Sequence, residues 1–442
     1  MADARRVARR IGGNLGRLLG GKAAAGLLSL AYMVLAARAL GREDYGVLIL
    51  AHTYVTAIAG IIEFPGWHAV VSYGARAAAE EDWARLSRLT VFAGSVEIAC
   101  GALAVAAAAA LAPLVGPRLG WSPQAVAFAL PYSFAALGTV RATPAGYLQL
   151  IGRFDLLGWH NMVAPLVRLV GAGVCVLART GLHGFLVAWL VAALAEWAVM
   201  WALGAWAARK RLSPPALRNL SATVVQENPG LWRFMWGANL DVTLAELGGR
   251  LTPLAIGALL GPGATALYAV AQRATAILAQ PAQILGQAAY AELAHLVASG
   301  DQGPGVRAVL RRAAGAALLA AAPICLGIAL FGDRLAVLVG GDGFAGAGAI
   351  MLWLALARAI QLVAPPMSAA LTALRRPGLS VAANLASSVL ALAALPLLVA
   401  WGGLAGAGAQ ALLQAALVVG LLLWMLGHAT APAAAAAQRV EV

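Results

Sequence analysis

Apolar runs of about 20 residues occupy most of this chain, and they constrain its fold more than any other feature. Of the 442 residues, 62% are hydrophobic and only 11% are charged. Soluble domains carry about 25% charged residues, so a soluble fold is excluded. Helices satisfy their own backbone hydrogen bonds in hydrocarbon, and the length of the runs suits them. The sequence therefore predicts an all-α polytopic membrane protein.

Hydropathy predicts about twelve transmembrane helices joined by short connections. We expect six helices in an N-terminal lobe at 1–208 and six in a C-terminal lobe at 231–442, which ends in a short tail. A cytoplasmic linker at 209–230 joins the lobes; it contains Arg209, Lys210 and Arg211. The predicted spans are 16–37, 45–71, 89–112, 123–140, 156–178, 182–207, 231–260, 264–291, 308–331, 344–372, 378–400 and 403–427.

Lysine and arginine are distributed unevenly between the two sides of the predicted membrane. The side of the N-terminus carries 22 of them, and the opposite side carries five: Arg38, Arg42, Arg118, Arg179 and Arg334. The positive-inside rule then places both termini in the cytoplasm, as an even number of spans also requires. This bias explains the net charge of +13 without a nucleic-acid partner.

A weak internal repeat indicates that the two lobes are related. Residues 12–15 read GGNL and residues 237–240 read GANL; Leu40-Gly41 before Tyr45 recurs as Leu260-Gly261 before Tyr268. Six spans per lobe preserve orientation, so the repeat predicts a pseudo-two-fold axis along the membrane normal and a central cavity. Chance matches of common residues are the alternative explanation.

A polar stripe runs along the predicted span 231–260. At about 100° per residue, Asn239, Thr243, Glu246 and Arg250 fall within about 60° of arc. A charge at the bilayer centre costs roughly 2.5–3.5 kcal/mol on insertion scales, so this stripe is expected to face a cavity or partners inside a bundle. Glu246 and Arg250 are four residues apart and could instead neutralise each other.

Four other predicted spans carry aligned polar residues. These are Tyr45, His52, Thr56 and Glu63; Asn161 and Arg168; Gln272, Arg273, Gln280, Gln283 and Gln287; and Arg358, Gln361, Ser368 and Thr372. Arginine suits phosphate and amides suit sugar hydroxyls, which indicates an anionic, hydroxyl-rich ligand. The predicted substrate-binding residues are Arg168, Arg250, Arg273, Arg358, Asn239, Gln272, Gln280, Gln283 and Gln361.

Three carboxylates are candidates for binding a coupling ion: Glu246, Glu63 and Asp241. Asp241 points away from the main stripe, so pairing with a neighbouring helix is its alternative role. Lone polar residues in spans often hydrogen-bond between helices for packing alone. The same explanation applies to Glu97 and Glu196.

Motifs for catalysis, cofactors or metals are not found in the sequence. Residues 16–23 approach the phosphate-loop pattern, but Ala23 replaces the required Ser or Thr and no strand precedes it. Cys100, Cys175 and Cys325 lie within apolar runs without metal-ligand spacing. We expect no catalytic residue, no cofactor and no metal.

The turn Arg38-Ala-Leu-Gly-Arg-Glu-Asp-Tyr-Gly46, with Glu63-Phe-Pro-Gly66 and Arg76 after the second span, resembles a known family. It is similar to the polysaccharide (O-antigen type) flippases of the multidrug/oligosaccharidyl-lipid/polysaccharide exporter superfamily. The turn Leu260–Tyr268 looks like its counterpart in the second half. The resemblance implies an inner-membrane protein that moves undecaprenyl-pyrophosphate-linked oligosaccharide across the membrane by alternating access. Expected partners are this lipid-linked oligosaccharide, membrane lipids, a polymerase and other polysaccharide-assembly proteins.

Two other functions are compatible with a polytopic membrane protein. An ion-coupled drug or metabolite antiporter of the same superfamily needs buried carboxylates and aromatic residues for organic cations, and the arginines in the spans argue against it. A membrane glycan polymerase needs a large outer loop with catalytic residues, and the predicted outer loops are short.

Overall fold

The computed structural model describes residues 2–64, 66–213, 219–278, 292–293, 296, 304–374 and 376–437. Side chains are not described at 2–19, 238, 240–242, 244–247, 277, 377 and 429–437. Every regular element in these ranges is a helix. Internal contacts divide the chain into two units, Met1–Arg250 and Leu251–Val442.

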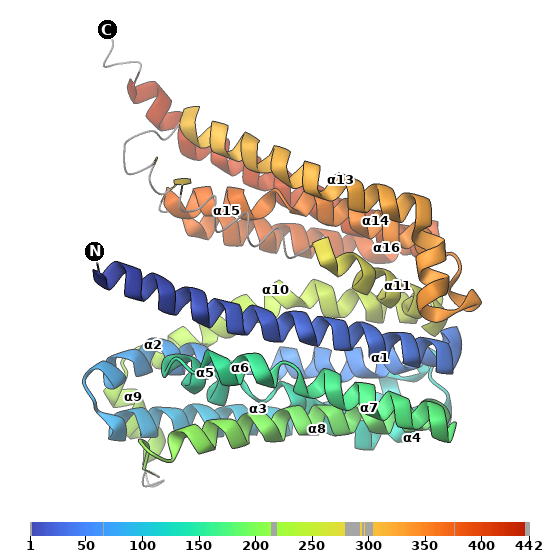
Figure 1. Cartoon of the computed structure of the whole chain (residues 1–442), viewed down its shortest axis with the longest axis horizontal. Helices are drawn as coiled ribbons and strands as arrows, with labels where there is room; N and C mark the ends of the chain where they lie inside the picture. The colour runs from blue at the N-terminus through green and yellow to red at the C-terminus, as the bar shows by residue number, and fades with distance from the viewer. Residues whose placement is uncertain are drawn as a thin grey trace. The chain divides into compact units, whose positions relative to one another are not determined.

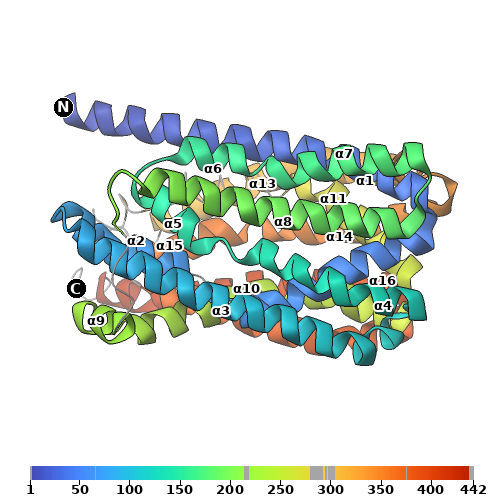
Figure 2. The same ribbon diagram turned by 90° about the horizontal axis from the view of Figure 1, so that it is seen from below.

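The first unit is a helical bundle (Figures 1 and 2). In it α7 packs against both α1 and α8, and α2 packs against α3 and α5. Its elements are α1 (Ala2–Ile62), α2 (Gly66–Ala79), α3 (Trp83–Val115), η1 (Pro117–Leu119), α4 (Pro123–Tyr132), η2 (Ser133–Thr139), α5 (Ala142–Leu150), α6 (Phe154–His160), α7 (Val163–Ala178), α8 (Gly181–Ala208), α9 (Leu220–Glu227) and most of α10 (Leu231–Leu260).

The second unit is organised around α14 (Ala347–Gln361), which packs against four other described α-helices of that unit. The remaining elements are α11 (Pro262–Thr275), η3 (Ala276–Leu278), α13 (Pro304–Gly340), η4 (Asp342–Phe344), α15 (Ala364–Ala373) and α16 (Pro377–Ala437). One hydrophobic core of this unit joins α13, α15 and the two parts of α16 around Leu371 and Leu422.

Glycine breaks the longest helices where the chain must turn back. Gly41 interrupts α1 with φ 72° and ψ −177°, and α1 reverses direction there (Figure 1). Gly403 interrupts α16 with φ 54° and ψ −133°. A side chain is strained at positive φ, so glycine suits both turns. Each of these helices therefore supplies two crossings of the membrane.

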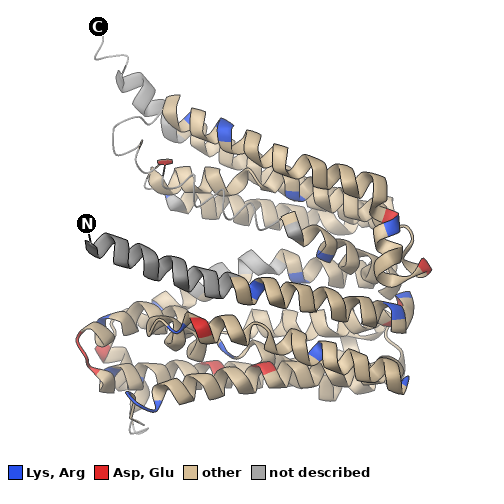
Figure 3. Cartoon of the chain, viewed as in Figure 1, with Lys and Arg blue, Asp and Glu red and all other residues tan. Residues whose placement is uncertain are grey.

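Eight helical segments of the described chain are long and apolar enough to cross a membrane, and two of them, Gly20–Ile62 and Gly378–His428, contain the glycine breaks. Few of the residues along these helices are charged (Figure 3). With α10 and α11, these segments agree with the predicted count of about twelve. The prediction of an all-α polytopic membrane protein is confirmed.

The helix α10 begins at Leu231 and ends at Leu260, the bounds of the predicted span. The preceding α9 is held on α3 by Arg88, whose Nη2 donates to Glu227 Oε1 at 2.5 Å. The division into units falls inside α10, after Arg250, because the earlier part of this helix packs with the first unit. The lobe boundaries expected from the sequence, with a linker at 209–230, remain a prediction.

The structure reproduces the predicted repeat at the level of backbone conformation. Gly261, which precedes α11, has φ 86° and ψ 174°, close to the dihedrals of Gly41. The fourth and tenth spans are also both interrupted: η2 follows α4, and a turn at Leu362 and Val363 separates α14 from α15. The two halves therefore share a glycine turn after the first span and a break in the fourth.

Candidate functional site

The interrupted fourth span places irregular backbone inside the first unit. Backbone groups freed in a membrane protein must find partners inside the protein. Here the buried Glu97 accepts hydrogen bonds from the amides of Ala142 (2.5 Å) and Thr143 (2.7 Å), the first residues of α5. Trp201 Nε1 donates to the carbonyl of Val140 at 2.7 Å. These hydrogen bonds satisfy backbone groups at the break, and the break borders a pocket.

The pocket has a volume of about 490 Å³ and belongs entirely to the first unit. Helices α1, α2, α5, α6, α8 and α10 and the break after η2 contribute to it. Its lining residues are Lys22, Gly60, Glu63, Trp67, Thr139, Arg141, Ala142, Ala145, Gln149, Phe154, Leu157, His160, Asn161, Met200, Asn239, Thr243 and Arg250.

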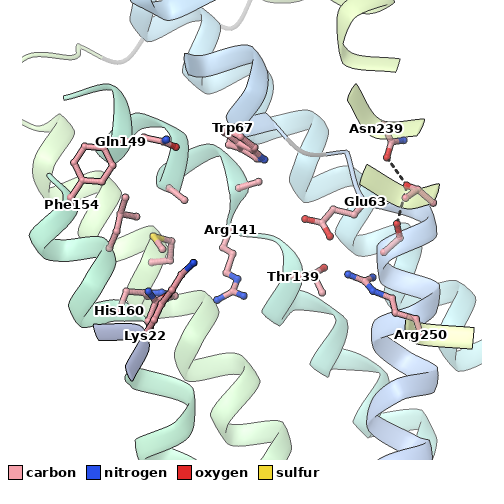
Figure 4. Close-up of a pocket in the computed structure, with 17 residues that line it drawn as sticks. Lys22, Glu63, Trp67, Thr139, Arg141, Gln149, Phe154, His160, Asn239 and Arg250 are labelled. Atoms are coloured by element: carbon pink, nitrogen blue, oxygen red, sulfur yellow. Dashed lines mark hydrogen bonds between the residues drawn. The ribbon is translucent and has the colours of Figure 1, made fainter. Parts of the chain in front are cut away.

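Cationic side chains outnumber carboxylates in this lining. Lys22, Arg141 and Arg250 carry positive charge, and Glu63 is the one carboxylate among the lining residues. Figure 4 shows Lys22, Arg141 and His160 on one side of the pocket and Glu63, Asn239 and Arg250 on the other. Such a lining favours an anionic ligand that also accepts hydrogen bonds.

Arg250 reaches the pocket along the surface of α1. Its Nη1 donates to the carbonyl of Thr56 at 2.7 Å. A Cβ atom at Gly60 would overlap the Arg250 guanidinium. Two turns earlier on the same stripe, the Thr243 hydroxyl lies 3.1 Å from Asn239 Oδ1 and 3.3 Å from the carbonyl of Gly60. The stripe predicted on this helix therefore faces protein and a pocket.

Arg141 is positioned by an ion pair inside the bundle. It precedes α5 with φ −151° and ψ 5°, and its Nη1 donates to Glu196 Oε1 on α8. The carbonyl of Glu196 accepts a hydrogen bond from His160 Nε2 at 2.9 Å. Because Nε2 donates, a neutral His160 leaves Nδ1 as an acceptor. Glu196 thus orients two residues of the pocket lining.

Lys22 and Arg141 were not predicted as pocket residues, because the charge bias of the sequence places both on the cytoplasmic side. For Arg141 a signal was present: Pro131 and Gly138 lie within the fourth span, and both residue types weaken helices. Trp67, Gln149 and Phe154 were also missed. These residues belong to the short helices α2, α5 and α6. Because each of these helices is bounded by a break, helical periodicity in the sequence does not relate their pocket-facing residues to one another.

Arg168 lies in a different cluster of the first unit. Its Nη2 is 3.1 Å from His52 Nε2, and its Nη1 donates to the Tyr32 hydroxyl at 3.3 Å. Its guanidinium carbon lies 5.6 Å from the ring centroid of the buried Trp189. The expectation that Asn161 and Arg168 share one helix face was wrong. The chain turns at Asn161 and Met162, between α6 and α7, so the helical period does not continue.

Of the predicted substrate-binding residues that the structure describes, four lie in the second unit. Gln272 and Arg273 are in the last turn of α11, and Arg358 and Gln361 are in the last turn of α14, a helix that packs on α11. Arg273 is exposed; the others are half-buried. Gln280 and Gln283, and the side chains of Glu246 and Asp241, lie outside what the structure describes.

A polytopic helical bundle with a polar pocket among interrupted helices is an architecture found in membrane transporters. Comparison with known proteins agrees. A family described as "Polysaccharide biosynthesis protein" matches residues 34–347, and the chain belongs to this family. The inner membrane protein YghQ of Escherichia coli (strain K12) is 27% identical over 270 residues, which are 61% of this chain and 76% of that protein.

Solved structures of MOP-superfamily transporters have the same fold. An inward-facing multidrug resistance MATE family transporter has a TM-score of 0.73 and 14% identity, covering 92% of this chain and 95% of its own. A MOP superfamily transporter from Pyrococcus furiosus, described as having a binding pocket of reverse polarity, has a TM-score of 0.58 and 14% identity, with coverage of 95% and 96%. At these identities the likeness establishes the fold. The chain is therefore a multi-pass membrane protein of the polysaccharide biosynthesis family that has the fold of these transporters.

Proposed function

We propose that this protein moves a lipid-linked oligosaccharide, carried on undecaprenyl pyrophosphate, from the cytoplasmic to the periplasmic leaflet of a bacterial inner membrane. The movement would occur by alternating access between two lobes, 1–208 and 231–442, with both termini in the cytoplasm. Family membership supports the connection with polysaccharide, and the transporter fold supports movement across a membrane. The other partners would be membrane lipids, a polymerase and further polysaccharide-assembly proteins.

The observation that carries this proposal is the set of cations in the first-unit pocket. Lys22, Arg141 and Arg250 converge on one cavity that contains a single lining carboxylate. Pyrophosphate is the one group that every cargo of this class shares, and guanidinium groups bind its oxygens as bidentate donors. Amide and hydroxyl groups from Asn239 and Thr243 add neutral hydrogen-bonding capacity suited to a glycan.

The cargo would meet further residues during its passage. We propose that Arg168 in the first unit and Gln272, Arg273, Arg358 and Gln361 in the second contact pyrophosphate or sugars at some stage, together with Gln280 and Gln283. Glu63 lines the pocket and is the first candidate for a coupling proton or cation. Glu246 and Asp241 remain further candidates for that role.

The test is polysaccharide export in host cells that lack the chromosomal copy and carry plasmid-borne variants. Arg141→Ala and Arg250→Ala should each reduce surface polysaccharide about tenfold, which corresponds to roughly 1.4 kcal/mol of lost interaction. Arg118→Ala is the matched control, because Arg118 is exposed at a helix end and donates to the carbonyl of Leu114. Full export by both pocket variants would disprove the role of the cations. Resistance to organic cations without an effect on polysaccharide would instead favour the antiporter function.

A further inference from the structure

One part of the pocket lining is aromatic and neutral. Along α5, Ala142, Ala145 and Gln149 follow each other at spacings of three and four residues, so they share one face of this helix. Two of them are alanines, which leave free space above the helix. Trp67 and Phe154 line the same pocket, and Gln149 lies between them in Figure 4.

Trp67 is held in place by its surroundings. It lies in the first turn of α2, and its backbone packs directly on Gly146 of α5, where an added Cβ would lie 2.7 Å from Trp67 Cα. The ring of His68 is 3.6 Å from the Trp67 ring between centroids, at an interplanar angle of 32°. One face of the indole is therefore covered by protein, while the half-buried residue still reaches the pocket.

Phe154 is the first residue of α6 and directly follows the turn from α5. Its neighbours Arg153 and Asp155 bind each other, with Arg153 Nη2 2.8 Å from Asp155 Oδ2. The hydrogen bonds that Arg153 donates to the Asp155 carboxylate raise the pKa of the Arg153 guanidinium, which stays charged and paired. Arg153 also lies over the Trp206 ring at 5.4 Å from its centroid. The charges beside Phe154 are thus satisfied by each other and by Trp206, and neither of them is among the lining residues.

We propose that Trp67, Phe154 and Gln149 form a saccharide subsite for the sugar attached directly to the pyrophosphate. This inference rests on the proposed function and deepens it. A sugar ring presents an apolar C–H face, which suits an aromatic ring, and hydroxyls at its edge, which suit the amides of Gln149 and Asn161. Arg141 and Lys22 lie next to this group in Figure 4, so a pyrophosphate bound by them would place its first sugar here.

The size of the pocket limits what the subsite holds. A volume of about 490 Å³ is within the range of 300–1,000 Å³ typical of small-ligand sites. A pyrophosphate with its first sugar suits such a volume, whereas the later sugars of a long glycan have to lie outside it. The subsite therefore selects the first sugar and tolerates variation further along the chain.

Binding to the purified full-length protein in lipid nanodiscs tests this proposal. The two probes are farnesyl pyrophosphate and the same lipid pyrophosphate carrying one N-acetylglucosamine. Trp67→Ala and Phe154→Ala should each weaken binding of the sugar-bearing probe about tenfold and leave the affinity for farnesyl pyrophosphate unchanged. Trp67→Phe should retain most of the affinity because it keeps an aromatic face. Trp159→Ala is the control, because Trp159 is an exposed aromatic on α6 that does not line the pocket.

The two probes separate failure of the subsite from failure of the proposed function. Equal weakening of both probes in the variants, or no weakening of either, overturns the subsite while pyrophosphate binding stands. A wild-type protein that binds neither probe overturns the lipid-linked cargo itself. Thermal unfolding of each variant identifies any that is misfolded, and Trp67→Phe then serves as the conservative variant for the comparison.

Discussion

Arg250 occupies the space that a side chain at Gly60 would fill. The guanidinium of Arg250 lies against the bare backbone of α1 at Gly60, and its Nη1 donates to the carbonyl of Thr56 at 2.7 Å. Glycine at this position thus lets a cation from α10 cross the surface of α1 and enter the pocket. The contact also ties the predicted polar stripe to the first unit, because Thr243 of the same stripe lies 3.3 Å from the carbonyl of Gly60.

The substitution Gly60→Ala should therefore displace the Arg250 side chain, while the other cationic lining residues, Lys22 and Arg141, stay in place. We expect polysaccharide export to fall about tenfold, because the displaced guanidinium loses its alignment with an anionic cargo. Export assays in cells, combined with thermal unfolding of the purified protein, measure the effect. Gly173→Ala is the matched control, since a Cβ at Gly173 on α7 meets nothing within 4 Å. Export at the wild-type level by Gly60→Ala would show that the position of Arg250 is unimportant.

Glu97 should contribute mainly to stability. Both of its carboxylate oxygens accept amide hydrogen bonds at the start of α5, and it is fully buried. Glu97→Gln retains one acceptor and leaves one amide unsatisfied, which costs about 1–3 kcal/mol. Thermal unfolding in detergent should show a lower midpoint for this variant. Glu80→Gln, which alters the ion pairs of the exposed Glu80 with Arg76 and Arg85, should shift this midpoint little.

The sequence predicted the helices well where long apolar runs set their length. The bounds of α10 were correct because an uninterrupted run of 30 residues leaves little choice of register. The glycine turn at Gly41 was also recognisable, because its match at Gly261 marked a repeated structural position. Hydropathy and glycine positions are local sequence signals, and they determine where helices run and where the backbone turns.

The site was less predictable because helical periodicity fails at interrupted spans. Asn161 lines the pocket and Arg168 does not, although seven residues separate them, because α6 ends before α7 begins. Arg141 was placed outside the membrane because its apolar run ended there, yet its side chain pairs with Glu196 within the bundle and the amide of the next residue, Ala142, donates to Glu97. Partners of this kind depend on tertiary structure and leave no periodic pattern.

Arg168 should hold the two parts of α1 together across Gly41. It contacts Tyr32 before the glycine and His52 after it. We expect Arg168→Ala to lower the unfolding midpoint strongly, and Arg168→Lys to lower it less, because lysine keeps the charge but loses the planar fork. Binding of farnesyl pyrophosphate to the lysine variant distinguishes this role from cargo binding. Unchanged affinity with reduced stability supports positioning, whereas reduced affinity at unchanged stability supports direct contact with pyrophosphate.

Glu63 should link transport to an ion gradient. It lines the same pocket as the cations and belongs to the segment between α1 and α2. We expect Glu63→Gln, which keeps the size but cannot ionise, to bind farnesyl pyrophosphate normally while its transport no longer responds to a pH gradient. Proteoliposomes with a fluorescent lipid pyrophosphate measure this response. Asp333→Asn is the control, because Asp333 accepts amide hydrogen bonds at the turn before α14. A normal response of the Glu63→Gln variant to the pH gradient would show that Glu63 does not bind the coupling ion and that another carboxylate does.

If the two halves share the same turn, alanine at Gly41 and alanine at Gly261 should destabilise the protein by similar amounts. Both have positive φ with ψ near 180°, a conformation that is essentially restricted to glycine, so alanine at either position costs about 1–3 kcal/mol. Gly26→Ala is the control; it lies in regular helix of α1, where alanine is favoured by about 1 kcal/mol. Unfolding of the three variants in nanodiscs should show two similar decreases and one unchanged or higher midpoint. A decrease for Gly41→Ala alone would mean that the second turn can adopt another conformation, and that the two halves do not share this constraint.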